Sequence, residues 1–192
     1  MQKVQTGRVI EFYSNTCLVD ISGLTVQCSI FGKQDIVVGD RVNIEYQNEN
    51  DPKSALIISK QERTSELTKR SIRGSKVVAA NISHVGILLV QNPTTSTEFI
   101  DKWIASSKAS NIKPFIINNK IDIDMPSDYL QKVALYNNID IKIFNVSAKE
   151  NTGLKDLTQY LENKCTIFVG NSGAGKSTLT SKLTGIDIKT KA

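Results

Sequence analysis

A glycine-rich stretch at residues 170–177 carries the strongest chemical signal in the sequence. It reads Gly-Asn-Ser-Gly-Ala-Gly-Lys-Ser and fits the phosphate-loop pattern Gly-x-x-x-x-Gly-Lys-[Ser/Thr]. The glycines let successive backbone N–H groups face a β-phosphate, and a helix starting near Lys176 would add the positive end of its dipole. Lys176 and Ser177 are the candidate catalytic residues, because Lys176 would reach the β- and γ-phosphates and the Ser177 hydroxyl would bind Mg²⁺. The expected phosphate-binding residues are Gly170, Asn171, Ser172, Gly173, Ala174, Gly175, Lys176, Ser177 and Thr178.

A second motif, Asn119-Lys120-Ile121-Asp122, comes directly after a strand expected at residues 114–118. The Asp122 carboxylate can accept two hydrogen bonds from the N1–H and 2-amino groups of guanine, which adenine lacks. Because adenine would leave the carboxylate unpaired, such a site can reject it by as much as ~10⁴-fold. Lys120 can lay its aliphatic stem along the base, and Asn119 can tie this loop to the phosphate loop. The motif therefore predicts a guanine site at a strand's carboxyl end, where ligands bind in such sheets.

A third piece, Ser147-Ala148-Lys149, follows the strand expected at residues 141–146. Its expected role is a backbone N–H, that of Ala148, donated to the guanine O6. The residues of this tripeptide are common, so the motif is informative because of its position at the end of a strand and not because of its composition. The three motifs together resemble those of GTPases, in which the phosphate loop usually comes first. Here the base-reading motif comes first, so the order is circularly permuted, and neighbouring chain ends make such a reconnection sterically possible.

The elements that must position these motifs follow from the alternation of apolar runs and helical patterns after residue 84. Continuous apolar strands joined by helices predict a parallel sheet with right-handed crossovers and both faces covered. The expected strands are residues 85–90, 114–118, 141–146 and 166–169. The expected helices are residues 98–109, 127–136 and 154–162, and one from residue 176 onward.

The first sixty residues have a different pattern, with short β-branched runs separated by turn signals such as Ser22-Gly23 and Gly39-Asp40. Five short strands without a long helix predict a small barrel, and the OB-fold is the commonest five-stranded choice, although an SH3-like barrel would give a similar pattern. The expected strands are residues 4–12, 16–21, 24–30, 42–46 and 55–59.

A basic segment follows the barrel at residues 60–76. Six basic and two acidic residues give it a charge of +4, nearly the whole net charge of +5. The segment is either a solvated linker or a strip that contacts nucleic-acid phosphates, since Lys and Arg clusters gain affinity by releasing counterions. The candidate RNA-binding residues are Lys60, Arg63, Lys69, Arg70, Arg73 and Lys76.

The bulk composition narrows the class of protein. The chain has 192 residues, of which 40% are hydrophobic and 22% charged, as in ordinary globular domains. The three cysteines, Cys17, Cys28 and Cys165, are odd in number and lack Cys-x-x-Cys spacing, which argues against a disulfide framework or a zinc site within these residues. No signal peptide or membrane-spanning run is found, so we expect a cytoplasmic protein without a membrane partner.

The permuted motif order, together with a small barrel in front, resembles the RsgA (YjeQ) family of ribosome-associated GTPases. The stretch Glu62-Arg63-Thr64-Ser65-Glu66-Leu67-Thr68, followed by Ala79-Ala80-Asn81-Ile82, is similar to that family's join between barrel and GTPase domain. The stretch Phe115-Ile116-Ile117-Asn118-Asn119-Lys120-Ile121-Asp122 is similar too. The resemblance implies a GTPase that acts late in small-subunit assembly and binds the 30S subunit and its 16S rRNA. It also implies GTP or GDP and Mg²⁺ as ligands, and we expect a monomer.

The resemblance implies three regions: a barrel and RNA-binding candidate at residues 1–62, a basic linker at 63–76 and a circularly permuted GTPase domain at 77–192. The family's switch threonine, Asp-x-x-Gly motif and C-terminal zinc-binding domain do not appear after Lys176. The expectation is therefore an incomplete GTPase domain that binds nucleotide with little intrinsic hydrolysis, and Zn²⁺ only in the domain that is missing.

Two other functions remain open at this point. One is an RNA-binding module whose guanine-nucleotide site is structural and does not hydrolyse GTP. The other is a phosphate-loop ATPase or kinase, for which residues 119–122 would be a chance match. Loss of nucleotide binding in Lys176→Ala, with RNA binding unaffected by GDP or GTP, would favour the RNA-binding module. Competition by ATP as effective as by GTP would favour the ATPase or kinase.

Overall fold

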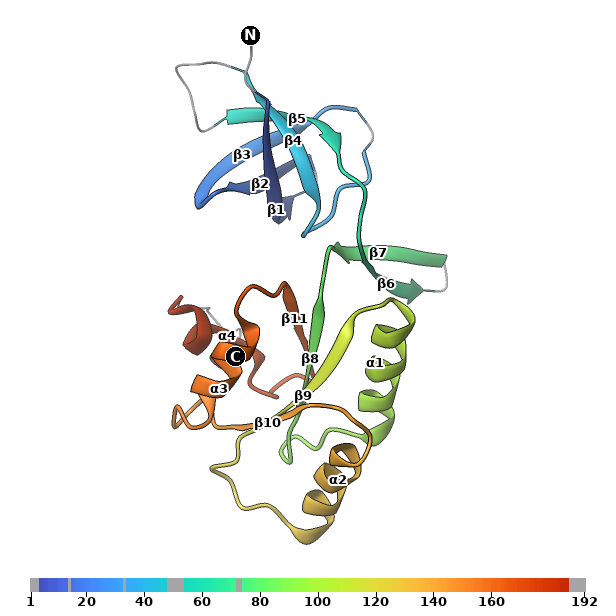
Figure 1. Ribbon diagram of the computed structural model, residues 1–192, viewed down its shortest axis with the longest axis vertical. Helices are drawn as coiled ribbons and strands as arrows, with labels where there is room; N and C mark the ends of the chain where they lie inside the picture. Colours follow the sequence, from blue (N-terminus) through green and yellow to red (C-terminus); the bar gives the residue numbers. More distant parts are fainter. Residues whose placement is uncertain (1–3, 14, 33, 48–53, 72–73, 187–192) are drawn as a thin grey trace. The chain divides into compact units, whose positions relative to one another are not determined.

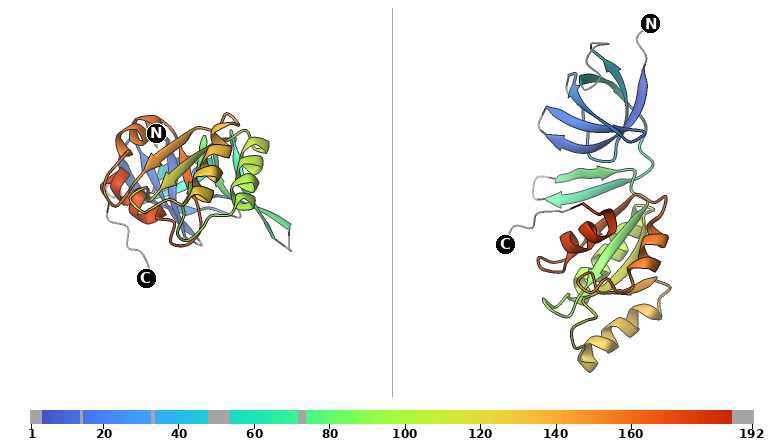
Figure 2. Two further views of the ribbon diagram at one scale, coloured as in Figure 1. Left: turned by 90° about the horizontal axis from the view of Figure 1, so that it is seen from below. Right: turned by 90° about the vertical axis from the view of Figure 1, so that its left-hand side faces the viewer.

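The computed structural model describes residues 4–13, 15–32, 34–47, 54–71 and 74–186, with only the backbone described at residues 69–71. The chain divides into two compact units, Met1–Ile82 and Ser83–Ala192. Figures 1 and 2 trace each unit along the colour ramp from the N-terminus.

The first unit contains a closed barrel of five strands in the order β1-β2-β3-β5-β4. Alternate side chains point inward, and the core is built from small and β-branched residues such as Val9, Val19, Val26, Ile44 and Ile57. This order, with a parallel β3–β5 pair closing the sheet, confirms the expected OB-like barrel over an SH3-like one. The strands are β1 (Gln5–Tyr13), β2 (Thr16–Ile21), β3 (Leu24–Ile30), β4 (Arg41–Tyr46) and β5 (Ser54–Lys60).

An antiparallel hairpin, β6 (Glu66–Ser71) with β7 (Gly74–Ala80), completes the first unit. Val38 bridges Ala79, and the Ala80 N–H donates to the Val38 carbonyl over 2.9 Å, which attaches the hairpin to the barrel. Gly39 has a φ of +93°, and a Cβ there would lie 2.0 Å from the Ala80 carbonyl oxygen. The close approach of the two backbones therefore requires glycine at this position.

The second unit is built on a four-stranded parallel sheet in the order β10-β9-β8-β11. All six residues of β8 are buried, as expected for a central strand covered on both faces. The chain's latest strand, β11, joins the sheet beside β8, and the Ser83 N–H donates to the Cys165 carbonyl over 2.9 Å. The strands are β8 (His84–Leu89), β9 (Lys113–Asn119), β10 (Ile143–Val146) and β11 (Thr166–Val169).

Helices cover both faces of this sheet (Figure 1). Leu157 of α3 and Leu179 of α4 pack on one face against Phe115, Ile117 and Phe144, where neighbouring rings meet edge to face. On the other face α1 contacts β8 and β9. The helices are α1 (Thr97–Ala109), α2 (Ser127–Asn137), α3 (Leu154–Leu161) and α4 (Lys176–Thr184). The expected alternation of strands and helices is thus confirmed.

The boundary between the two units differs from the one expected. The sequence predicts a basic linker at residues 63–76 and a GTPase domain from residue 77, whereas the division falls between Ile82 and Ser83. The segment expected to be a linker contains β6 and the beginning of β7. Leu67 of this segment is buried and pairs with Ala79, which follows the segment in β7, but Leu67 lies among many charges that suggested a solvated strip.

Candidate functional site

The phosphate loop connects β11 to α4, as its sequence requires. Gly173 has a φ of +76° and Gly175 a φ of +90°, and both values favour glycine. A Cβ on Gly175 would lie 2.5 Å from the Asn119 side-chain nitrogen, so glycine also lets the two motifs approach each other. Helix α4 begins directly after Gly175, and the first N–H groups of a helix have no partner within it. The loop can therefore offer backbone donors to an anion.

Lys176 and Ser177 lie in the first turn of α4. The Lys176 Nζ donates to the carbonyls of Gly170 over 2.8 Å and of Asn171 over 2.9 Å, which places the ammonium group inside the curve of the loop. The Ser177 hydroxyl makes no hydrogen bond to any residue in the described parts of the chain. A hydroxyl oxygen of this kind, beside a phosphate site, suits Mg²⁺, which binds oxygen ligands.

Asn119 ties the base-reading motif to the other two motifs. Its side chain is buried; Nδ2 donates to the Ala174 carbonyl over 3.0 Å, and Oδ1 accepts from the Ala148 N–H over 3.2 Å. The predicted contact of Asn119 with the phosphate loop is therefore present in the structure. The Ala148 N–H, expected to face a guanine oxygen, is engaged by Asn119, so a base would share this donor.

Asp122 projects from the same loop and remains exposed. Its Oδ1 accepts a hydrogen bond from the Ser147 hydroxyl over 2.5 Å. This hydrogen bond is the main cause that lowers the pKa of Asp122 below its usual value, and the charges of Lys149 and Lys120 act in the same direction. The side chain is therefore a carboxylate at neutral pH, as an acceptor of two N–H groups must be.

The three motifs meet around one cavity of about 290 Å³. Its lining brings together the carboxyl ends of β9 and β10 and the start of α4, as expected for ligand sites in parallel sheets. The lining residues are Asn119, Lys120, Asp122, Ile123, Ala148, Lys149, Gly175 and Thr178.

The loop after β8 also contributes to this site, and the sequence reasoning missed it. Lys120 Nζ donates to the Asn92 carbonyl over 2.7 Å, and Pro93 lies where a Cβ on Gly173 would be 3.4 Å away. Thr95, fully buried, accepts from the Val90 N–H over 3.1 Å and fixes the base of the loop. The sequence signal that could have identified this loop is its position, because it follows the carboxyl end of a strand, as the other two loops of the site do.

The basic segment does not form one exposed strip. Lys60 donates to the Asp35 carbonyl over 2.8 Å, and Lys76 is exposed on β7. The backbones of Lys69 and Arg70 belong to β6, but their side chains and all of Arg73 lie outside the described residues. Of the six RNA-binding candidates, Lys76 is thus the one whose described side chain is exposed.

Arg63, another of these candidates, faces inward. Its side chain is 7% exposed and forms an ion pair over 2.7 Å with Asp40, which is fully buried. Glu66 lies 2.9 Å and Asp35 3.1 Å from the same guanidinium. These carboxylates, chiefly Asp40 by its hydrogen bond, raise the pKa of Arg63 above its usual value. The donors of Arg63 are thus used within the protein, and its contact with RNA stays a prediction that this arrangement does not favour.

Asn81 completes this arrangement from the end of the hairpin. Its Nδ2 donates to the Gly39 carbonyl over 2.9 Å, and its Oδ1 accepts from the Thr64 N–H over 2.9 Å. We call Arg63, Asp40 and Asn81 the barrel–hairpin joint. Buried polar groups of this kind are costly unless every one has a partner, and these do.

Neither a metal cluster nor a membrane-spanning helix is found among the described residues. The described residues contain no group of three or more His, Cys, Asp or Glu side chains that could hold a metal ion. Among the helices of the described ranges, none is both long and apolar enough to cross a membrane.

Comparison with known proteins supplies independent evidence on this arrangement. A family model described as RsgA GTPase matches residues 60–192. The small ribosomal subunit biogenesis GTPase RsgA 2 of Bacteroides thetaiotaomicron is 35% identical over 185 residues, which are 88% of this chain and 59% of that protein. The RsgA protein of Photorhabdus laumondii is 32% identical over 93% of this chain and 54% of its own length. The chain thus spans little more than half the length of these curated relatives.

Solved structures agree in fold. The crystal structure of YjeQ from Thermotoga maritima has a TM-score of 0.79 and 30% identity, covering 98% of this chain and 68% of that one. The structure of YloQ, described as a circularly permuted GTPase, has a TM-score of 0.70 and 25% identity over 94% of this chain and 64% of its own. The expected circular permutation therefore matches a known arrangement.

Proposed function

Because the chain belongs to the RsgA GTPase family, we propose that it binds guanine nucleotide at the cavity of about 290 Å³ and serves in a GTPase that acts on the small ribosomal subunit. The observation that carries the proposal is Asn119, whose two hydrogen bonds join the base-reading loop to the phosphate loop and to Ala148. Asn119 thereby brings the residues proposed to bind the base and those proposed to bind the phosphates into one site.

The role of each residue follows from its geometry. Asp122 accepts the N1–H and 2-amino groups of guanine, and Lys120, held by the Asn92 carbonyl, supports the face of the ring. The N–H groups that begin α4 bind phosphate oxygens, and Lys176 exchanges its two carbonyl partners for the β- and γ-phosphates. The discrimination against adenine comes from the carboxylate that adenine cannot satisfy.

Magnesium fits the same site. The Ser177 hydroxyl would hold it beside the phosphates, where the ion neutralises charge that develops as GTP is hydrolysed to GDP. Lys176 and Ser177 are accordingly the proposed catalytic residues of this chain. Their task is to bind and orient the β- and γ-phosphates.

The ribosomal partner is proposed from the relatives' names, small ribosomal subunit biogenesis GTPase. The barrel and the exposed Lys76 would contact 16S rRNA of the 30S subunit. A cytoplasmic location and a monomeric state belong to the same proposal.

The test is a titration with fluorescent GDP, competed in parallel by unlabelled GTP and ATP. We expect GTP to displace the probe at least 100-fold more effectively than ATP, because adenine leaves the Asp122 carboxylate without its two donors, a mismatch worth roughly 10⁴-fold at most. Lys176→Ala should abolish binding, and Lys182→Ala, an exposed lysine on the same helix, should not. Equal displacement by ATP and GTP would favour a phosphate-loop ATPase instead and remove the guanine assignment.

The second candidate function is an RNA-binding module with a structural nucleotide site. It would be favoured if GTP bound tightly, was never hydrolysed in the presence of 30S subunits, and left RNA affinity unchanged. Hydrolysis that increases on addition of 30S subunits and fails in Lys176→Ala would exclude this module.

A further inference from the structure

A row of positive charge lies at the amino-terminal edge of the sheet in the second unit, at the other end of the strands from the nucleotide cavity. Lys113 is the first residue of β9, Lys142 directly precedes β10, and Lys164 lies two positions before β11. His84, the first residue of β8, pairs with Lys113 in the parallel ladder. Each strand of the order β10-β9-β8-β11 therefore begins at a basic side chain. We call Lys113, Lys142 and Lys164 the lysine row.

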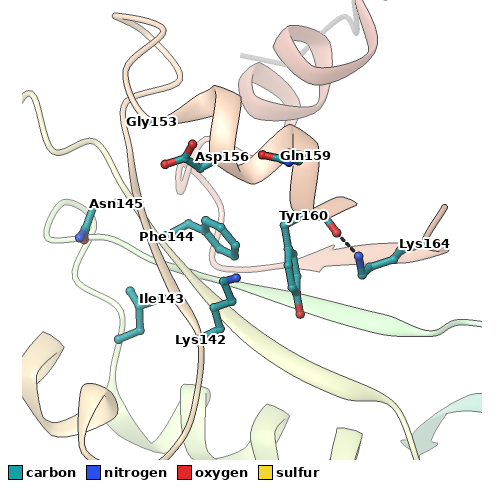
Figure 3. A pocket seen from close by; sticks show the side chains of 9 residues that line it. All are labelled: Lys142, Ile143, Phe144, Asn145, Gly153, Asp156, Gln159, Tyr160 and Lys164. Atoms are coloured by element: carbon teal, nitrogen blue, oxygen red, sulfur yellow. Dashed lines mark hydrogen bonds between the residues drawn. The ribbon is translucent and has the colours of Figure 1, made fainter. Parts of the chain in front are cut away.

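Two of these ammonium groups are held in place by one aromatic ring. Lys142 Nζ lies 4.7 Å and Lys164 Nζ 4.6 Å from the centroid of Tyr160, and Lys164 also donates to the Tyr160 carbonyl. Figure 3 shows the two lysines on opposite sides of this ring. Cation–π contacts fix the side chains, so a ligand that binds them causes less loss of rotamer freedom than it would at free lysines.

The surface beside the row is hollowed. A cavity of about 730 Å³ lies between β10 and α3, with Phe144 and Tyr160 in its wall, and Asp156 is the one acidic side chain among the residues that line it (Figure 3). No ion pair joins the lysine row to a carboxylate anywhere in the described ranges of the chain. Within those residues the lysine row is therefore not ion-paired.

His84 does not add a charge to the row. Burial, together with repulsion from Lys164 and Lys113, lowers the pKa of His84 below its usual value. The three lysines alone thus carry the charge at neutral pH. Although Lys142 and Lys164 belong to the two edges of the sheet, their ammonium groups lie 4.7 Å and 4.6 Å from the same Tyr160 centroid, so these two charges of the row are close together.

We propose that the lysine row is a docking surface for the phosphate backbone of RNA. Three cations, two of them held by Tyr160, beside a hollow with Phe144 and Tyr160 in its wall complement a polyanion that carries bases, and the release of counterions supplies the affinity. The choice of RNA over other polyanions rests on the proposed ribosomal function. An acidic polypeptide is the competing ligand, which the experiment separates.

This surface is independent of the nucleotide cavity. The strands between them have six or seven residues in β8 and β9, a length of about 20 Å at 3.3 Å per residue. RNA and guanine nucleotide can therefore occupy the second unit together. A loss of one binding function need not affect the other, which makes the two proposals separable.

The test uses the full chain and a fluorescein-labelled single-stranded RNA, with anisotropy measured over a range of KCl concentrations. In the triple variant Lys113→Gln, Lys142→Gln, Lys164→Gln, we expect roughly 10- to 100-fold weaker binding, and a slope of log K against log salt that is smaller by about 2. The matched control Lys102→Gln, Lys108→Gln, Lys155→Gln removes three exposed helix lysines and should leave the slope nearly unchanged.

Three further readouts decide the result. Fluorescent GDP should bind both triple variants as it binds the parent, which separates this proposal from the nucleotide site and shows that the fold is intact. Replacing the row by arginines should retain RNA binding. Equal losses in the row and control variants, absence of RNA binding in the parent, or equal competition by polyglutamate would each overturn the RNA-docking proposal while leaving GDP binding to be judged separately.

Discussion

The nucleotide cavity and the barrel–hairpin joint both contain charged residues that the sequence marked as functional, yet the two regions use charge in opposite ways. Asp122 lines the cavity with an exposed carboxylate, and Lys120 beside it is held by the Asn92 carbonyl, which leaves its aliphatic stem for a ligand. Arg63, by contrast, is 7% exposed and holds the buried Asp40. The difference teaches that spacing relative to a strand end predicts where a side chain lies, whereas local charge density does not.

The physical reason lies in what fixes each side chain. A residue just after a parallel strand is carried to the ligand edge of the sheet by the backbone alone. A residue in a basic run has no such constraint, and it pairs with whichever carboxylate the fold brings near. In the first unit that carboxylate is Asp40, which also accepts the Val37 N–H over 2.8 Å.

The largest effect is expected in the cavity, at Asp122. Asp122→Asn replaces an acceptor by a donor opposite the 2-amino group, and we expect the preference for GDP over ADP to fall by about 10³- to 10⁴-fold. Competition titrations with both nucleotides measure it. Asp124→Asn, an exposed neighbour outside the cavity lining, is the control; an equal loss there would show that the effect is not base reading.

The joint should respond in stability and not in ligand affinity. Arg63→Met leaves Asp40 buried without its partner, so we expect the free energy of unfolding of the first unit to fall by about 3–5 kcal/mol. Denaturant titration, monitored by hydrogen exchange at residues 66–80, measures this change. GDP affinity should stay unchanged, and Lys60→Met, with a weaker 3.9 Å contact to Asp35, should cost far less. A variant as stable as the parent but with reduced RNA binding would restore the RNA role of Arg63.

Asn119 tests whether the cavity depends on its internal connections. Asn119→Ala leaves the Ala174 carbonyl and the Ala148 N–H without their partner, so we expect GDP to bind roughly 30- to 100-fold more weakly, about 2–3 kcal/mol. Calorimetric titration measures the change, with the exposed Asn137→Ala as control. Unchanged affinity would mean that the two loops are placed by the sheet alone.

The smallest effect concerns the pH dependence of guanine binding. The Ser147 hydroxyl is the main group that lowers the pKa of Asp122, and binding requires the carboxylate form. Binding is therefore lost as the pH falls through the pKa of Asp122, and Ser147→Ala should move this loss to higher pH. GDP titrations across the acidic range measure the midpoint. If the midpoint does not change, a group other than Asp122 causes the loss of binding at low pH.

Much of the fold could be predicted from local signals. The strands β2 and β3 begin and end at the expected residues, because β-branched runs are bounded there by clear turn residues. The loops of the cavity were predictable as well, since both motifs follow apolar runs that can only be buried strands. The contact of Asn119 with the phosphate loop was expected, but the close packing of its side chain against Gly175 was not, because a Cβ at Gly175 would meet the Asn119 side-chain nitrogen at 2.5 Å only in the folded chain.

The hairpin and the loop after β8 were not predicted, for different reasons. In β6 and β7 the alternation of Leu67, Val77 and Ala79 is interrupted by charges, and a bulge between Leu67 and Thr68 shifts its register. In the loop, Asn92 acts through its backbone carbonyl, and a carbonyl is common to every residue type. Side-chain chemistry can be read from a sequence, whereas backbone chemistry depends on tertiary structure.

Strand β11 pairs with β8, from which it is far apart in the sequence, and this separation affects the order in which the second unit can fold. Ser83 and Cys165, joined by hydrogen bonds, are 82 residues apart, whereas β8 meets β9 after a single helix. As the chain leaves the ribosome, the base-reading half can therefore assemble while the phosphate-binding half is still being translated. Contacts of such separation close slowly, because loop-closure entropy is lost before they form. Under the proposed function, nascent polypeptides of this protein would therefore acquire nucleotide binding only once α4 has emerged.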